Sequence, residues 1–355
     1  MNKTLPPHDE KTIISTSRLT KAFGNLVAVN DLNLEVQRGD VFGFLGPNGS
    51  GKTTTIRMLL GLIRPSAGRA LLFGMDTAYQ LPEILQRIGA IVEMPIFYPY
   101  LSGRDNLRVI AANSGMVLGK ANEARISEIL DIVELRTYEK LAYRKYSLGM
   151  KQRLGIAAAL LNDPELVMLD EPTNGLDPAG VIEIRRLIQR LASLGKTVFL
   201  SSHILSEVQQ VCNRVAILRK GNLVKLGAVE DLLRTDEEIE VRMNDTIQTE
   251  QALALLQELR GGAINWLTDV RIDQNKRNQS IIKLAAPNDR SAEVNQLLAQ
   301  HQLYAAEIHP REGSLEEVFL QLVAPSSAAG PYIGGTMAGS NETSTAATAL
   351  KGDQK

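Results

Sequence analysis

The sequence predicts an α/β fold in which a largely parallel sheet is covered by helices on both faces, followed by a small α+β domain. Apolar runs such as 41–45 and 166–170 alternate with segments of helical periodicity. Uniformly apolar strands are typical of parallel sheets buried on both faces. A glycine-rich loop joins one such strand to a helix, and after about residue 236 the order of strands and helices changes. That change indicates a second, smaller domain.

The first part of the chain carries the larger domain. The helix expected at 53–63 ends at Pro65, because proline cannot continue a helix. The middle segment, about 95–161, repeats apolar residues three and four apart and is expected to be a helical subdomain. The remaining expected strands are 13–19, 32–37, 41–46, 166–170, 197–202 and 214–219, and the remaining expected helices are 181–195 and 204–212.

The second part of the chain reads as strand, helix, strand, strand, helix, strand, which is the order of a ferredoxin-like domain. A last helix at 314–323 begins with a capping box from Ser314 to Glu317. In the tail, 20 of 32 residues are Ala, Gly, Ser or Thr, too little apolar surface to offset the entropy of ordering. The expected division is a flexible N-terminus (1–11), the larger domain (12–235), an accessory domain (236–323) and a disordered tail (324–355).

Composition limits the classes of function. The chain has 355 residues, 44% of them hydrophobic and 22% charged, as in a globular protein. Its formal net charge of −1 argues against a basic nucleic-acid binder. One cysteine, Cys212, gives no internal disulfide and fits a reducing compartment. No apolar run reaches the roughly 18 residues that span a bilayer, so any membrane role is expected to come through a partner.

The segment GPNGSGKT matches the phosphate-loop pattern G-x-x-x-x-G-K-[ST]. Glycines let the backbone wrap closely around phosphate, and the following helix adds partial positive charge. Lysine at this position reaches the β- and γ-phosphates of ATP, and the next hydroxyl binds Mg²⁺. The expected nucleotide ligands are Gly46, Pro47, Asn48, Gly49, Ser50, Gly51, Lys52, Thr53 and Thr54, of which Thr53 also holds the metal.

An acidic pair, Asp170 and Glu171, follows the apolar run LVML. The carboxyl ends of strands are where α/β sheets place their chemistry. Asp170 is suited to hold Mg²⁺, and Glu171 to act as the general base toward the attacking water. Together with the phosphate loop, the pair predicts an ATP-hydrolysing site that uses ATP and Mg²⁺.

Several segments resemble those of ABC-transporter ATPases, in the order that this family has them, over about 13–227. YSLGM resembles the signature segment, and the resemblance implies that Ser147, Gly149 and Met150 contact nucleotide on a partner chain. The segment departs from the common LSGGQ but keeps its serine and second glycine. NGLDP resembles the D-loop, which carries Asp177.

Three single residues extend the resemblance. His203 in LSSH stands where the family has a switch histidine that bonds the γ-phosphate, and Phe23 stands where it has an aromatic that stacks on adenine. Glu93 stands where the family usually has glutamine, and a carboxylate can also bind the metal. Each also has a simpler interpretation: Phe23 as a core aromatic, His203 as a helix cap and Glu93 as a solvated strand end.

The resemblance implies a P-loop NTPase fold, with a RecA-like core and an inserted helical subdomain. It also implies a head-to-tail dimer, as a homodimer or with a related ATPase subunit, that drives a separate integral-membrane permease. The segment around Glu93 and the late SLEEVF resemble the ATPases of bacitracin-type and lantibiotic exporters. The expected place is therefore the cytoplasmic face of the membrane, reached through the permease, with no nucleic acid as partner.

Two alternatives stay open at the level of the sequence. One is a soluble ABC ATPase that acts in translation or repair, although such chains usually carry two cassettes or long coiled coils, and this chain has one phosphate loop. The other is an ATP-sensing clamp, although such cassettes tend to lose the base, and Glu171 and His203 are both present. Because every nucleotide motif lies before residue 228, the ATP site is expected to survive removal of residues 236–355.

Overall fold

A computed structural model of the chain describes residues 10–93, 96–117, 119–234, 238–260, 262, 264–274, 280–311 and 313–323. The tail expected to be disordered (324–355) and most of the N-terminus expected to be flexible lie outside the described residues. Within the described ranges, no helix is long and apolar enough to cross a membrane.

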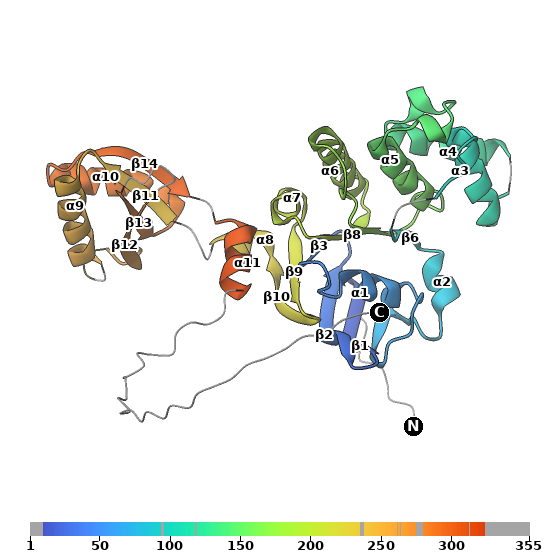
Figure 1. Ribbon diagram of the computed structural model, residues 1–355, viewed down its shortest axis with the longest axis horizontal. Helices are drawn as coiled ribbons and strands as arrows, with labels where there is room; N and C mark the ends of the chain where they lie inside the picture. Colours follow the sequence, from blue (N-terminus) through green and yellow to red (C-terminus); the bar gives the residue numbers. More distant parts are fainter. Residues whose placement is uncertain are drawn as a thin grey trace, which may run out of the picture. The chain divides into compact units, whose positions relative to one another are not determined.

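The larger domain is built around a six-stranded sheet in the order β10-β9-β3-β8-β7-β6 (Figure 1). The five strands from β9 to β6 are parallel, and β10 at the edge is antiparallel to β9. This confirms the expected parallel sheet and adds two edge strands, of which β10 was not indicated by the sequence and β6 was indicated only through the interpretation of Glu93 as a strand end. The strands are β3 (Val41–Leu45), β6 (Ile88–Ile91), β7 (Leu166–Asp170), β8 (Thr197–Ser202), β9 (Arg214–Arg219) and β10 (Asn222–Ala228).

The sheet is buried on both faces, as the uniformly apolar strands predicted. Alternate residues of β3 enter two different cores: Val41 and Leu45 join one cluster, and Phe42 and Phe44 join the other. This follows from the two-residue period of a strand. The first cluster is covered mainly by helices, and the second by an antiparallel sheet and α1. The helices that flank the sheet are α1 (Lys52–Leu59), α2 (Leu81–Leu85), α6 (Pro178–Ser193), α7 (Leu205–Val211) and α8 (Val229–Arg234).

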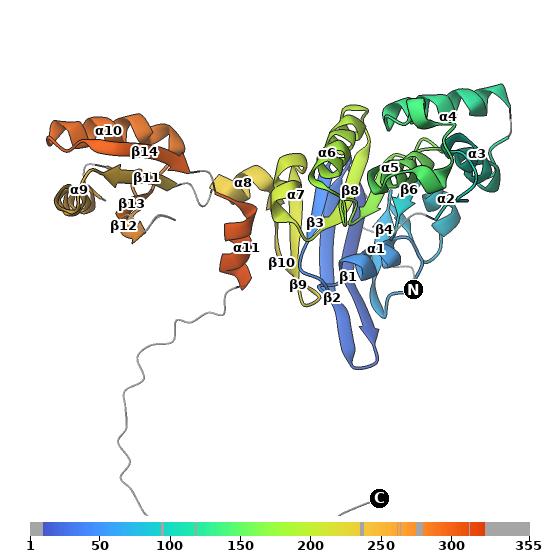
Figure 2. The same ribbon diagram turned by 45° about the horizontal axis from the view of Figure 1, so that its top comes forward.

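A four-stranded sheet in the order β2-β1-β4-β5 forms the second layer. Its long hairpin of β1 and β2 is the longest extended feature of the larger domain (Figure 2). The first two strands were expected, whereas β4 and β5 were not, because their short segment lacks a clear apolar alternation. The strands are β1 (Thr12–Phe23), β2 (Leu26–Gln37), β4 (Ala67–Leu72) and β5 (Met75–Asp76).

The helical subdomain lies where the periodicity predicted it. It contains three α-helices and two 3₁₀ turns, and its apolar side chains belong to the helix-covered core cluster of the main sheet. The elements are α3 (Gly103–Asn113), α4 (Lys120–Ile132), η1 (Arg136–Tyr138), η2 (Tyr143–Lys145) and α5 (Leu148–Ala159).

The accessory domain has a core of its own, formed by residues between 239 and 308. Its four antiparallel strands lie in the order β12-β13-β11-β14, and two longer helices follow the first and third strands. This order confirms the ferredoxin-like topology expected from the sequence. The elements are β11 (Glu238–Met243), α9 (Thr246–Leu259), β12 (Asp269–Gln274), β13 (Ser280–Ala285), η3 (Asn288–Arg290), α10 (Ser291–Gln300) and β14 (Ala305–Arg311).

The last described helix, α11 (Leu315–Val323), follows the accessory domain in sequence but packs with the larger domain. Leu315 and Val318 belong to the helix-covered core cluster of the main sheet. Ser314 Oγ accepts a hydrogen bond from the Glu317 N–H at 3.2 Å, the first half of the expected capping box. The expected division at residue 236 therefore needs a refinement, because the accessory domain is followed by a helix that packs into the larger domain.

Candidate active site

Three neighbouring strands bring the expected catalytic side chains to one edge of the sheet. Strand β8 lies between β3 and β7, and both pairs are parallel. The phosphate loop follows β3, the acidic pair ends β7, and His203 follows β8. Because the carboxyl ends of parallel strands meet at one edge, side chains more than 100 residues apart in sequence become neighbours.

The phosphate loop requires glycine at both of its ends. A Cβ on Gly46 would lie 2.5 Å from both the Leu218 carbonyl oxygen and Ser50 Oγ, and a Cβ on Gly51 would lie 2.5 Å from the Ala28 carbonyl oxygen. Gly51 also has a φ of +105°, which L side chains rarely adopt. Among the described atoms, the buried Ser50 Oγ has no hydrogen-bond partner. A buried hydroxyl without a partner is available to bind a phosphate oxygen.

The other expected ligands in and after the loop differ in exposure. Pro47, Asn48 and Gly49 are exposed at its tip, and Thr53 and Thr54 are partly exposed in the first turn of α1. Lys52 is buried, and its Nζ donates to the Gly46 carbonyl oxygen at 2.7 Å. The ammonium is thus held inside the loop, and the two partly exposed threonines follow it in sequence.

The carboxylate of Glu171 lies between Lys52 and His203. Its Oε1 is 3.1 Å from Lys52 Nζ, and its Oε2 is 2.7 Å from His203 Nδ1. Glu171 has a φ of 49°, an unusual backbone conformation for a residue with a side chain, and such conformations cluster at functional sites. One contact network therefore joins the loop lysine, the acidic pair and the histidine that the sequence predicted separately.

Asp170 is buried at the end of β7, and Ser201 on β8 holds it in place. Ser201 Oγ donates to Asp170 Oδ1 at 2.5 Å and accepts a hydrogen bond from the Glu171 N–H at 2.9 Å. One hydroxyl thus positions both members of the acidic pair. Ser201 was not predicted from the sequence; its signal was a serine two residues before His203, at the end of the expected strand 197–202.

The signature and D-loop segments each begin a helix. Ser147 Oγ accepts a hydrogen bond from the Met150 N–H at 3.2 Å and caps α5, and Asp177 Oδ1 accepts one from the Gly180 N–H at 3.0 Å and caps α6. The Met150 side chain packs against the helix-covered core, which suits methionine better than glutamine. In the part of the chain that the structure describes, no hydrogen bond or ion pair joins these residues to the Glu171 network.

Helices α5 and α6 approach each other beside the signature. A Cβ on Gly149 would lie 3.7 Å from Glu183 Oε2 and 3.8 Å from the Gly180 Cα, which is ordinary contact. One turn further along α5, the buried Arg153 lies 3.2 Å from Glu183 Oε2 through its Nη2. This ion pair links the helix that begins at the signature to the helix that begins at the D-loop.

Phe23 and Glu93 lie on the exposed surface. Half of the Phe23 side chain is exposed (50%), with Lys21 Nζ 4.9 Å from the ring centre. Its exposure excludes the interpretation of Phe23 as a core aromatic. Glu93 is 66% exposed and forms an ion pair with Arg57 of α1. Glu93 thus carries a charge partner that the usual glutamine would not need.

Comparison with known proteins places these motifs in a family. The model of the ABC transporter family matches residues 29–174. The bacitracin transport ATP-binding protein BcrA of Bacillus licheniformis is 41% identical over 88% of this chain and 97% of that protein. This chain belongs to the ABC transporter family. The lantibiotic transport ATP-binding protein SrtF of Streptococcus pyogenes is 37% identical over 60% of this chain and 89% of that protein. A solved dimeric bacterial ABC transporter cassette is 25% identical over 61% of this chain and 99% of its own, with a TM-score of 0.55.

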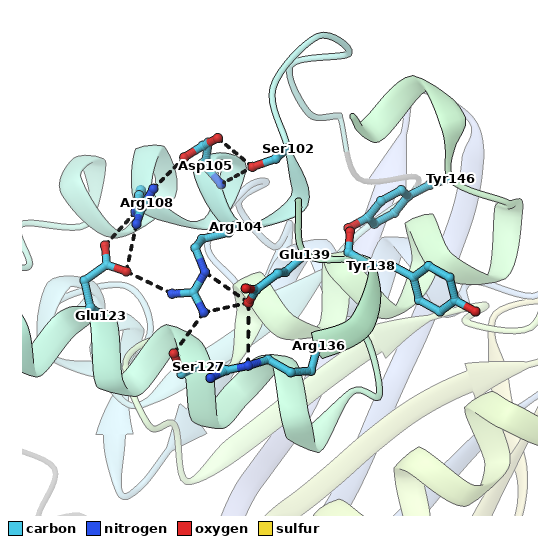
Figure 3. Close-up of polar contacts among 10 residues, drawn as sticks. All are labelled: Ser102, Arg104, Asp105, Arg108, Glu123, Ser127, Arg136, Tyr138, Glu139 and Tyr146. Carbon is cyan, nitrogen blue, oxygen red and sulfur yellow. Dashed lines mark hydrogen bonds and ion pairs between the residues drawn. The ribbon is translucent and has the colours of Figure 1, made fainter. Parts of the chain in front are cut away.

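Tyr146 stands where the ABC signature usually begins with leucine, and its surroundings accommodate the larger side chain (Figure 3). The ring is buried, and its hydroxyl donates to the Tyr138 carbonyl oxygen at 2.9 Å. Burial raises the pKa of Tyr146 to about 12. A Cβ on Gly103 would lie 2.1 Å from the Tyr146 hydroxyl. A side chain at position 103, the first residue of α3, would therefore displace the hydroxyl of the tyrosine that precedes Ser147.

An ion-pair network joins α3 to α4 and to the turn before the ABC signature (Figure 3). Arg104 donates to Glu123 at 2.9 Å and to Glu139 at 2.7 Å, and Arg108 donates to Glu123 at 2.5 Å. The hydrogen bond from Arg108 holds the pKa of Glu123 below its usual range. The hydrogen bond from Ser102 does the same for Asp105. The network fixes the frame of the helical subdomain that presents the signature.

Proposed function

We propose that the chain hydrolyses ATP at the Glu171 network, with Glu171 as the general base. The observation that carries this assignment is the placement of its carboxylate between Lys52 Nζ and His203 Nδ1, at 3.1 and 2.7 Å. Lys52 binds the β- and γ-phosphates, and the buried hydroxyl of Ser50 and the loop amides complete the phosphate cradle. Phe23 offers its exposed face to the adenine ring.

The reaction needs one proton acceptor and one in-line displacement. Glu171 takes a proton from the attacking water, whose oxygen bonds to the γ-phosphorus while the bond to the bridging oxygen of ADP breaks. Lys52 compensates charge on the phosphate oxygens. His203 contacts Glu171 through Nδ1 and bonds the γ-phosphate through its other ring nitrogen, so it orients both the base and the phosphate.

The residues at the site fit a bound Mg²⁺. Asp170 Oδ1 is occupied by Ser201, which leaves Oδ2 for the ion, and the Thr53 hydroxyl is partly exposed beside the loop. Among the described residues, no group of three or more histidine, cysteine or acidic side chains gathers to hold a metal. Mg²⁺ is commonly bound by one or two carboxylates plus substrate phosphates and water, where it neutralises charge on the transferred phosphoryl group. Glu93 is a further oxygen ligand once it leaves Arg57.

The signature acts on the nucleotide of a second chain. Glycine in a helix costs about 1 kcal/mol relative to alanine, and the packing around Gly149 leaves room for a Cβ. Packing within its own chain therefore does not explain why residue 149 is glycine. A γ-phosphate bound to the partner chain and approaching this position would explain it. Ser147, Met150 and Asp177 border the same surface. The similarity to a dimeric cassette supports this arrangement.

The transport role follows from the relatives. BcrA and SrtF are named for bacitracin and lantibiotic transport, and this chain matches 97% of the length of BcrA, including its accessory part. We infer that the chain drives export of an antibiotic, a peptide, a lipid or a polysaccharide through a separate permease. It reaches the cytoplasmic face of the membrane by binding that permease.

Co-purification from the native host tests the transport role. The full-length chain, carrying an affinity tag, is expected to bring down one membrane protein with several predicted spans, and the complex is expected to release phosphate from ATP. Lys52→Ala is the matched control, because it should keep the partner and lose phosphate release. Recovery of ribosomes or DNA in place of a membrane protein would overturn the proposal.

A further inference from the structure

Helix α11 places its apolar face in the core of the ATPase domain, although it follows the accessory domain in sequence. Leu315 is 0% exposed and Val318 is 8% exposed, and both share a core cluster with Val208 of α7 and Leu232 of α8. Leu320, on the same helix, is 64% exposed. The helix is thus amphipathic toward α7 and α8, the two helices that it contacts.

Polar contacts hold both ends of α11. At its start, the Leu315 N–H donates to Gln209 Oε1 of α7 at 3.0 Å. At its other end, Arg219 Nη1 of β9 donates to the Leu322 carbonyl oxygen at 3.4 Å. These bonds satisfy an amide of the first turn and a carbonyl of the last turn, which a helix cannot satisfy internally. The position of α11 is therefore specific, and Gln209 is the polar residue that connects α11 to α7.

Helix α7 depends on such neighbours. It has seven residues, no side-chain cap, and Val208 as its one fully buried residue, and isolated helices of this length are unstable in water. On its other side, Val208 packs closely over Gly43 of β3, where a Cβ would lie 2.5 Å from Val208 Cγ1. Helix α7 begins two residues after His203, so a shift of α7 moves the segment that carries the histidine.

An ion pair joins the accessory domain to α11. Arg311, the last residue of β14, forms an ion pair with Glu317 of α11. The same arginine lies 3.2 Å from Glu240 on β11. These contacts form one link between the accessory domain and α7, through α11; the chain itself also enters the accessory domain from α8.

We propose that α11 is a positioning element of the ATPase site: Leu315 and Gln209 hold α7, and α7 holds His203 against Glu171. The proposal rests on the catalytic role proposed for Glu171 and His203. It makes α11 one link between the accessory domain and the catalytic histidine.

Two aspartate substitutions on α11 test the proposal in the full-length chain. Leu315→Asp buries a charge against α7, whereas Leu320→Asp places the same charge on the exposed face of the same helix. Displacing a catalytic group by about 1 Å can lower the rate about 10²-fold. Leu315→Asp should therefore lower kcat by about 10- to 100-fold. Its affinity for ATP, which depends on the phosphate loop, should stay at the wild-type value, and amide exchange in α7 should become faster. Leu320→Asp should match the wild type in all three.

A second pair serves if Leu315→Asp does not fold. Gln209→Leu removes the acceptor for the Leu315 N–H, and Gln209→Glu keeps an acceptor oxygen and should restore kcat. Equal kcat and equal α7 exchange for Gln209→Leu and wild type would overturn the proposal, as would a loss of ATP affinity parallel to the loss of kcat. A wild-type chain without ATPase activity would instead count against the proposed function. In that case, amide exchange in α7 would still report whether α11 packs against it.

Discussion

Replacement of Gly149 by alanine is expected to stabilise the isolated chain and to impair the dimer. The new Cβ would lie 3.7 Å from Glu183 Oε2 and 3.8 Å from the Gly180 Cα, so it makes ordinary contacts and no clash. Alanine in place of a glycine in a helix interior gains about 1 kcal/mol, and Gly149, the second residue of α5, should gain less than that. For a domain of this size, the rise in Tm should therefore stay below about 4 °C. The same methyl group stands where the partner's γ-phosphate must approach.

Two measurements separate these effects. Thermal unfolding without nucleotide reports the isolated chain, and phosphate release at saturating MgATP reports the dimer. The expected result is an unchanged or higher Tm with a loss of phosphate release, at unchanged affinity for ATP in the variant's own phosphate loop. Gly149→Ala that unfolds earlier than the wild type would refute the packing argument. Gly149→Ala with wild-type phosphate release would refute the assignment of the signature.

Three further outcomes follow from single contacts. Lys52→Ala should abolish ATP binding or turnover, because it removes the ammonium from the phosphate loop; unchanged turnover in the folded variant would exclude the site. Arg153→Gln removes the cation that pairs with the Glu183 carboxylate beside the signature. The variant should show weaker ATP-dependent dimerisation at unchanged ATP affinity. Dimerisation equal to that of the wild type would show that this ion pair has no role in dimerisation. Arg87 donates a hydrogen bond to Glu165 and is the main cause that lowers the pKa of that carboxyl to about 2. The resulting stabilisation is complete above the ordinary pKa of 4.5 and is lost as the pH falls toward about 2. Glu165→Gln should therefore flatten the acid limb of a plot of Tm against pH, and an unchanged limb would contradict the assignment.

The sequence predicted most of the fold because its signals are local. Uniformly apolar strands such as β3 and β7, and the helical periodicity of α5, need no knowledge of distant residues. The phosphate loop and the acidic pair were readable for the same reason. Edge strand β10 was not predicted, and β6 was indicated only by the interpretation of Glu93 as a strand end, because short strands carry little alternation.

The features that could not be predicted from the sequence depend on contacts between distant segments. Ser201 reaches Asp170 only because β7 and β8 are neighbours in the sheet. The packing of α11 into the ATPase core brings together Leu315 and Gln209, which are 106 residues apart in sequence. The apolar periodicity of a helix does not predict which distant residue it will contact. This packing changes one expectation: removal of residues 236–355 uncovers the apolar faces of α7 and α8, so a chain shortened in this way should lose stability.

The central claim is that Glu171 is the base of an ATP-hydrolysing dimer, and Glu171→Gln tests it most directly. The amide keeps the shape of the side chain but cannot accept the proton from water, and loss of a general base costs roughly 10²–10⁴-fold in rate. Asp170 and Lys52 remain, so ATP should still bind, and the uncleaved nucleotide should shift the population toward the closed dimer. In size-exclusion chromatography with light scattering, the variant should therefore run as a dimer in MgATP and as a monomer in MgADP. Adding Ser147→Arg should abolish that dimer. Phosphate release at the wild-type rate by Glu171→Gln would contradict the account.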